Sequence, residues 1–208
     1  SISSSGSATE PWQMEAVEVA GLIRTGKLSS REATESCLAR LDRVNPKINA
    51  ITLTLQEEAL KAADAADMSL SRGDVLGPLH GVPVTTKCNT DQAGVPSDNG
   101  VVAFKDLVAK TDNPVIGNMR KAGAILFART NTPAFSMRWF TNNDLHGQTL
   151  NPYSKEHTCG GSSGGAGAAT AVGIGSIAHG NDIGGSIRWP AYCNGIVGIR
   201  PSYGRVPA

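Results

Sequence analysis

The chain has 208 residues, 24 of them glycine, and a net charge of +1. This length is sufficient for one sizeable hydrophobic core, and the near-zero charge argues against nucleic acid or an acidic membrane face as the main partner. No apolar run is long enough to span a bilayer, and the first residues lack a hydrophobic signal region. The four cysteines form no Cys-x-x-Cys pair and do not cluster with the four histidines, so we expect reduced thiols, no metal site and a cytoplasmic protein.

The first third of the chain predicts helices around a short strand. Residues 1–9 are rich in Ser and Gly and indicate a disordered terminus or an expression remnant, and residues 10–208 predict a single α/β domain. A helix is expected from residue 10 to near residue 26. Ser29 and Glu32 form a capping-box pattern that opens a second helix over 31–44, which Asn45-Pro46 should end. A strand over 48–55 and a helix over 56–70 follow.

The remainder alternates strands and helices. Residues 80–87 predict a short strand that ends in a lysine, and residues 113–121 and 124–128 predict a helix and a buried strand. A turn or helix begins at 131–133, residues 137–150 read as a loop, and 164–173 predict a helix of small residues. Short strands are expected at 176–179 and 196–199. This alternation predicts an α/β fold with a mixed, largely parallel β-sheet core flanked by helices.

One glycine-dense tract, from Cys159 to Arg188, contains two serine sites. Glycine tolerates positive φ and lets the backbone approach other groups closely. The two glycines before Ser186 could expose consecutive N–H groups, as an anion-binding nest does. In acyl transfer such a nest stabilises the negative oxygen of a tetrahedral intermediate.

The first serine site allows another interpretation. Residues 160–164 (Gly-Gly-Ser-Ser-Gly) match the Gly-x-Ser-x-Gly nucleophile elbow, which requires a buried strand immediately before the turn. Residues 151–158 do not resemble such a strand. A Ser-His-Asp triad would also need a histidine later in the chain, so this α/β-hydrolase interpretation is weak.

Three segments together resemble the amidase signature family, the Ser–cis-Ser–Lys amidases. They are Gly81-Val-Pro-Val-Thr-Thr-Lys87, Gly160-Gly-Ser-Ser-Gly-Gly165 and Asp182-Ile-Gly-Gly-Ser-Ile-Arg188. Their order and spacing also match, with Ser162 and Ser186 lying 24 positions apart. Weaker support comes from residues 123–133, 149–152 and 195–201, so that the resemblance extends from about Trp12 to the last residue.

The resemblance implies a catalytic triad. Ser186 would be the nucleophile, Ser162 a bridging serine after a cis peptide bond, and Lys87 the base. A buried lysine can be neutral, because loss of hydration lowers the pKa of an ammonium group, and a serine hydroxyl can both accept and donate a proton. The N–H groups of Ile183, Gly184, Gly185 and Ser186 would form the oxyanion hole.

Other residues receive supporting roles from the same resemblance. Asp182 and Arg188 would hold the nucleophile loop by hydrogen bonds. The loop context of Trp139 and Phe140, and not the resemblance, indicates that they could line a substrate pocket together with Met137, or could equally belong to the core. The sequence departs from the family at the residue after the lysine, where an acid is common and Cys88 stands here.

The resemblance implies hydrolysis of a small-molecule carboxylic amide through an acyl-enzyme on Ser186, with no cofactor and no metal. Two alternatives remain: a glutamine-dependent amidotransferase-type subunit, and a catalytically silent scaffold protein of the same fold. Family enzymes are more than twice as long as this chain. We therefore expect the domain to be incomplete at its C-terminal end and to need the C-terminal remainder of the enzyme, and the resemblance is also compatible with a homodimer.

Overall fold

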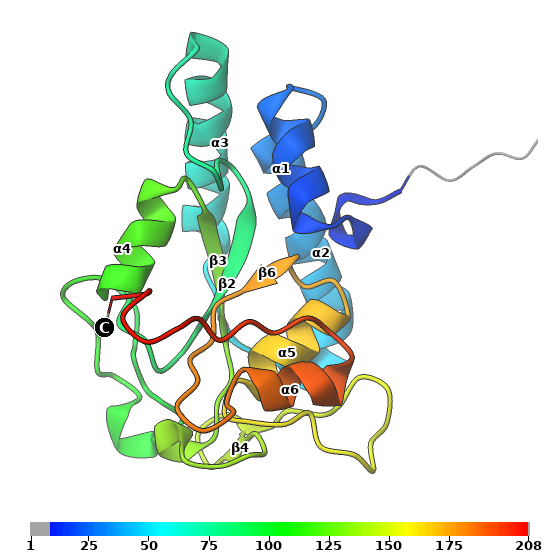
Figure 1. Cartoon of the computed structure of the whole chain (residues 1–208), viewed down its shortest axis with the longest axis vertical. Coiled ribbons are helices and arrows are strands. Elements are labelled where there is room, and N and C mark those ends of the chain that lie inside the picture. The colour runs from blue at the N-terminus through cyan, green and yellow to red at the C-terminus, as the bar shows by residue number, and fades with distance from the viewer. Residues whose placement is uncertain (1–8, 208) are drawn as a thin grey trace, which may run out of the picture.

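The computed structural model describes residues 9–207, so all but the last residue of the terminus expected at 1–9 lies outside the described part. Its centre is a four-stranded sheet in the order β1-β3-β2-β6 (Figure 1). These strands are β1 (Ile51–Thr54), β2 (Pro83–Lys87), β3 (Ile125–Thr130) and β6 (Ile177–Ala178). β2 is parallel to both β3 and β6, whereas β1 is antiparallel to β3. The predicted mixed, largely parallel α/β fold is confirmed.

In the described part of the chain, six α-helices surround the sheet: α1 (Ala16–Arg24), α2 (Ser30–Ile48), α3 (Gln56–Arg72), α4 (Pro114–Lys121), α5 (Gly164–Ala171) and α6 (Arg188–Asn194). Short 3-10 turns occur at η1 (Pro11–Gln13), η2 (Val102–Phe104) and η3 (Ala134–Ser136), and a small hairpin is formed by β4 (Asn142–Asn143) and β5 (Gly147–Gln148). Within residues 9–207, no helix combines the length and the apolar character that crossing a membrane requires.

Side chains of β3 take part in two of the three hydrophobic clusters of the core. Phe127 lies in a cluster with residues of α2, α3 and α5, while Leu126 lies in a second cluster with Val84 and with Ile116 of α4. Adjacent residues of a strand point to opposite faces, so α2, α3 and α5 cover one face and α4 covers the other. Full burial of a side chain such as Phe127, which is 0% exposed, contributes roughly 1.5–3 kcal/mol to stability.

The second helix confirms one prediction and corrects another. The Ser29–Glu32 capping box is present in both directions at its N-terminus. However, Asn45-Pro46 does not end the helix, which continues to Ile48 with Pro46 inside it. Pro46 removes one N–H donor from the last turn only, and the helix ends where Asn49 adopts the left-handed conformation with φ of 53°.

The end of the chain also differs from the prediction. The strand expected at 196–199 is absent, and α6, which was not expected, precedes this segment. Ile196 N–H donates to the Ala191 carbonyl of α6, so the residue continues the helix cap instead of joining a sheet. Val197 and Ile199 are 87% and 75% exposed.

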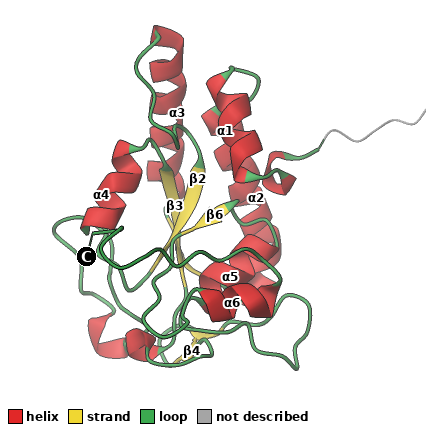
Figure 2. Cartoon of the chain, in the orientation of Figure 1, coloured by secondary structure: helices red, strands yellow, loops and turns green. Residues whose placement is uncertain are grey.

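The sheet brings distant segments to one edge. The parallel strands β2, β3 and β6 finish at the same edge, which is where sites commonly form in open α/β sheets. Lys87 is the last residue of β2 and pairs with Thr130 at the end of β3. Long loops and the β4–β5 hairpin lie at the bottom of the view in Figure 2, whereas α1 and α3 extend to the top.

Candidate active site

Lys87 is completely buried at the end of β2, with 0% of its surface exposed. Its Nζ donates hydrogen bonds to Ser162 Oγ and to Asn181 Oδ1, each at 2.7 Å. Burial disfavours the charged ammonium and lowers the pKa of Lys87 to about 7, although Cys88 and Asp182 act in the opposite direction. The amine can therefore act as a proton acceptor near neutral pH.

Ser162 occupies the turn that leads into α5. The peptide bond between Gly161 and Ser162 is cis, as the resemblance implied, and the Ser162 carbonyl accepts a hydrogen bond from Thr132 Oγ1 at 2.9 Å. Residues 149–163 form no strand. The nucleophile-elbow interpretation therefore lacks the buried strand that it requires.

Ser186 lies in the loop between β6 and α6 and is half-buried. Its backbone carbonyl accepts a hydrogen bond from Ser163 N–H at 3.1 Å, which ties the two serine loops together one residue from Ser162. Within residues 9–207 no hydrogen bond joins the two serine hydroxyls. The structure thus brings Lys87 and Ser162 into side-chain contact, and connects Ser186 to them through the backbone.

Asp182 organises the nucleophile loop. Its carboxylate is 1% exposed and accepts hydrogen bonds from the N–H groups of Gly185 (2.7 Å), Ile187 (3.1 Å) and Arg188 (3.2 Å). Arg188 Nε and a terminal guanidinium nitrogen add two contacts of 3.0 Å. The Arg188 side chain, followed by these backbone donors, holds the pKa of Asp182 far below its usual range despite its burial. The contacts expected of Asp182 and Arg188 are present.

One of the four N–H groups expected to form the oxyanion hole, that of Gly185, already donates a hydrogen bond within the loop. Because the Gly185 N–H is engaged by Asp182, it does not point into an open oxyanion site. The N–H groups of Ile183, Gly184 and Ser186 donate to no group in the part of the chain that the structure describes. Gly185 has a φ of 114°, which glycine adopts without strain. This turn therefore offers three unpaired donors rather than the four that were expected.

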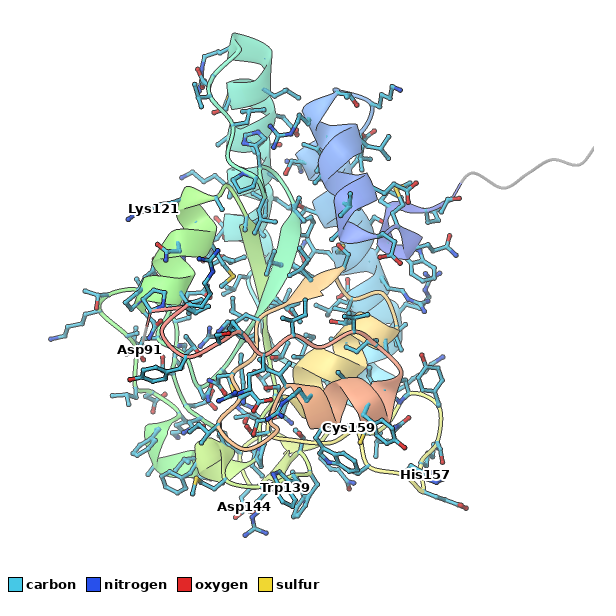
Figure 3. The ribbon with its side chains drawn as sticks, in the orientation of Figure 1. Asp91, Lys121, Trp139, Asp144, His157 and Cys159 are labelled. Carbon is cyan, nitrogen blue, oxygen red and sulfur yellow. The ribbon has the colours of Figure 1, made fainter. Side chains whose placement is uncertain are left out.

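The aromatic loop lies beside the serine turn. A surface hollow of about 400 Å³ is lined by Met137, Arg138, Trp139 and Phe140. A Cβ added to Gly161 would lie 2.7 Å from Arg138 O and Phe140 N, so this backbone packs directly against the residue before Ser162. Trp139 is 68% exposed and lies at the loop-rich end of the molecule (Figure 3). Trp139 and Phe140 are therefore exposed in this chain and do not belong to its hydrophobic core.

Several polar residues that the sequence did not single out complete the site. Asn181 contacts Lys87, Asn89 contacts Asn181, and Ser136 contacts Asn89. Arg200 Nε donates to the Asp182 carbonyl at 3.1 Å. Asn181 directly precedes the motif that begins at Asp182, so its position in the sequence could have indicated a place in the site. No pattern around Asn89 or Ser136 indicates one.

The residue after the lysine, Cys88, directly follows the end of β2. Cys88 is 1% exposed, and burial, with a further contribution from nearby Asp98, raises the pKa of its thiol to about 12. A thiol of this kind is un-ionised at neutral pH and inert as a nucleophile. Among the described residues, no three His, Cys, Asp or Glu side chains are arranged to hold a metal ion.

The comparisons with known proteins agree with this geometry. The family model described as Amidase matches residues 32–208. The chain is 57% identical over 197 residues to an indoleacetamide hydrolase of Bradyrhizobium diazoefficiens, covering 95% of this chain and 38% of that protein. It is 40% identical to a glutamyl-tRNA(Gln) amidotransferase subunit of Alkalilimnicola ehrlichii, covering 91% and 39% respectively.

Solved structures give the same result. The crystal structure of an amidase superposes with a TM-score of 0.86 at 38% identity, and the match covers 93% of this chain and 44% of that one. The chain therefore spans well under half the length of the relatives it matches. The family match over most of the chain and the similarity in both sequence and structure lead to one assignment: this chain belongs to the amidase signature family.

Proposed function

We propose that the protein carrying this chain hydrolyses carboxylic amides through an acyl-enzyme on Ser186. The observation that carries the proposal is the 2.7 Å contact between the buried Lys87 Nζ and Ser162 Oγ. Next to it, the loop of Ser186 holds three N–H groups that donate to no residue of the described part of the chain. A serine hydroxyl is a poor nucleophile until a base removes its proton. A neutral lysine acting through a second hydroxyl meets that requirement.

The chemistry follows from these positions. Lys87 accepts the Ser162 proton while Ser162 accepts the proton of Ser186, whose Oγ bonds to the amide carbon. The carbonyl oxygen becomes an oxyanion that accepts hydrogen bonds from the N–H groups of Ile183, Gly184 and Ser186. Collapse of the tetrahedral intermediate breaks the carbon–nitrogen bond, and the proton returns through Ser162 to the departing ammonia or amine. Water then hydrolyses the ester on Ser186 with the same proton relay.

The substrate class is inferred from the aromatic loop. Trp139 and Phe140 line the hollow beside the serine turn, and aromatic walls favour flat apolar groups. The 57% identical relative is named for indoleacetamide. We therefore propose small primary amides of aromatic acids as substrates, with ammonia as the first product.

Two alternatives carry less support. An amidotransferase component would share the serine and lysine chemistry, but the similarity to such a protein is 40% against 57% for the hydrolase. A silent scaffold would not need Lys87, Ser162 and Ser186 to be kept together, and all three are present.

We further propose that additional protein covers the exposed apolar residues near the end of the chain, as the C-terminal remainder of the enzyme. Val197, Ile199 and Tyr203 are 87%, 75% and 103% exposed, which is unusual for such side chains in a stable surface. Residues 1–208 alone should therefore self-associate. A soluble monomer by light scattering that also has full amidase activity in an ammonia-release assay would contradict this.

The test of the function is ammonia release from indole-3-acetamide by the protein that carries these residues, compared with its Ser186→Ala variant. We expect turnover in the first and none above background in the second. Mass spectrometry of the reaction quenched early should find an acyl group on the peptide containing Ser186. Turnover that survives Ser186→Ala, or an acyl group elsewhere, would overturn the proposal.

A further inference from the structure

The amide of Asn181 is the second contact of the Lys87 amine. Its Oδ1 accepts a hydrogen bond from Nζ at 2.7 Å, as short as the contact to Ser162. No carboxylate oxygen among the described residues lies within ion-pair distance of this amine. Lys87 is therefore held between a hydroxyl and a neutral amide oxygen.

The direction in which this amide points is fixed by its neighbours. Asn181 Nδ2 donates to Asn89 Oδ1 at 3.0 Å, while Asn89 Nδ2 donates to Ser136 Oγ at 2.9 Å and also lies 3.3 Å from Asn181 Oδ1. Ser136 Oγ then donates to Asn99 Oδ1 at 2.7 Å. The nitrogen of Asn181 is thus engaged by Asn89, so its oxygen, and not its nitrogen, faces the Lys87 amine.

The backbone at Ser136 adds a second observation. Phe135 and Ser136 both adopt positive φ values, 59° and 57°, which cost free energy for residues other than glycine. The Ser136 hydroxyl also contacts Thr132 Oγ1 at 3.0 Å, and Thr132 holds the Ser162 carbonyl. The strained turn thus links the chain of amides to the backbone of the bridging serine.

We infer that Asn181, oriented by Asn89, is a positioning residue that directs the lone pair of neutral Lys87 toward Ser162. The inference rests on the proposed function, because it specifies how the base of that mechanism is prepared. It assigns a positioning role to Asn181 and Asn89, which lie outside the serine–lysine triad.

The reason lies in the geometry of an amine. Neutral Nζ has two hydrogens and one lone pair, and only the lone pair can accept the Ser162 proton. As an ammonium, Nζ donates to both Ser162 and Asn181. Once it has lost the proton that faced Ser162, the acceptor at Asn181 retains one hydrogen and leaves the lone pair available to the serine. A reversed amide would instead donate its N–H to the lone pair and block the base.

The neutrality of the amide matters as well. The charged or titratable groups that influence Lys87 are Cys88, the residue directly after β2, and Asp182 from the nucleophile loop. His179, after β6, also lies close by: burial lowers its pKa, and Lys87 lowers it further. Asp182 is already engaged by Arg188 and by backbone N–H groups. A carboxylate in direct contact would favour the ammonium form, by about 1–3 pKa units for a close pair.

The experiment measures the rate of labelling by a fluorophosphonate between pH 5 and 10 in the protein that carries these residues. Asn181→Asp should shift the midpoint of the pH profile toward alkaline pH by one pH unit or more. Above the new midpoint the labelling rate should recover. Asn181→Ala should lower the rate about tenfold or more at every pH without that alkaline shift. Asn118→Asp, an exposed position on α4, is the matched control and should follow the unmodified protein.

If Asn181→Asp does not fold by circular dichroism, Asn89→Ala provides the second test. It frees the Asn181 amide to turn, so labelling should slow at all pH values while the midpoint remains in place. An unchanged profile in Asn181→Asp, or an unchanged rate in Asn89→Ala, overturns the inference. Failure of the proposed function is distinguishable, because labelling of the unmodified protein would then not depend on Lys87 at all.

Discussion

Lys87 Nζ lies 2.7 Å from Ser162 Oγ, although 75 positions separate the two residues in the sequence. β2 ends at the lysine, and the turn before α5 places the serine over that end. The contact joins an amine that burial makes partly neutral near pH 7 to a hydroxyl that can relay a proton. Because no carboxylate among the described residues shares the contact, burial dominates the lowered pKa of Lys87.

The first prediction concerns pH. Since burial lowers the pKa of Lys87 to about 7, fluorophosphonate labelling should rise with pH through about 7 and then level off. Lys87→Met should lower the rate by orders of magnitude and remove this rise. A titration with the same midpoint in Lys87→Met would assign the pH dependence to another group.

The same variant makes a prediction about stability. The folded-state pKa is lowered relative to 10.5, so the unfolded chain binds more protons between about pH 7 and 10.5, and stability rises with pH in that window. Below about pH 7 the cost of burying the ammonium is fully present. Lys87→Met should therefore be more stable than the unmodified protein at pH 6, by roughly 1–3 kcal/mol, with a smaller difference at pH 10. Thermal unfolding at both pH values checks this.

The sequence was sufficient for the four strands of the central sheet and for the lysine and serine motifs, because these depend on local pattern. It did not predict that α2 would continue past Pro46 or that residues 196–199 would fail to form a strand, because both outcomes depend on neighbours. The Asn181–Asn89–Ser136 chain is similar: its members lie in three separate segments, and only the folded sheet edge brings them together. The contact between the Gly185 N–H and Asp182 likewise depends on how the loop folds, and the local motif does not indicate it.

The second prediction tests how Asp182 holds the nucleophile loop. Asp182→Asn keeps the shape but weakens the acceptor for three backbone N–H groups and Arg188, so the labelling rate should fall at least tenfold and stability by about 1–3 kcal/mol. The pKa of Asp182 is lowered, so its contribution is present above the unfolded value of 3.8 and is lost only as pH falls below that value. Asp144→Asn, at an exposed position, is the control and should change neither rate nor stability (Figure 3).

The third prediction uses the close approach at Gly161. A methyl group there would lie 2.7 Å from Arg138 O and Phe140 N, so Gly161→Ala must displace the aromatic loop. We expect a higher KM for aromatic amides together with a lower melting temperature. Gly117→Ala on α4 is the matched control, because its added methyl meets nothing within 4 Å and should raise stability by about 0.5–1 kcal/mol. Equal behaviour of the two variants would contradict the close contact.

The fourth prediction concerns the substrate wall. Trp139→Ala removes an exposed aromatic surface from the hollow, so kcat/KM for indole-3-acetamide should fall about tenfold, which corresponds to about 1.4 kcal/mol. Activity on acetamide, which is too small to use the wall, should change little. Tyr153→Ala, an equally exposed aromatic outside the hollow, is the control. A parallel loss for both amides would indicate a structural role instead.

The last prediction separates the two serines. Ser186 lies in a loop whose Ile183, Gly184 and Ser186 N–H groups donate to no described residue, so an oxyanion can be stabilised beside its hydroxyl. The Ser162 hydroxyl instead faces the Lys87 amine. Ser186→Ala should abolish fluorophosphonate labelling. Ser162→Ala should slow it by about 10²-fold or more but leave the attachment point at Ser186, because water can substitute for the bridging hydroxyl. Ser202→Ala, at an exposed serine, should leave the rate unchanged. Peptide mapping decides the assignment, since a label found on Ser162 in the unmodified protein would make that serine the nucleophile.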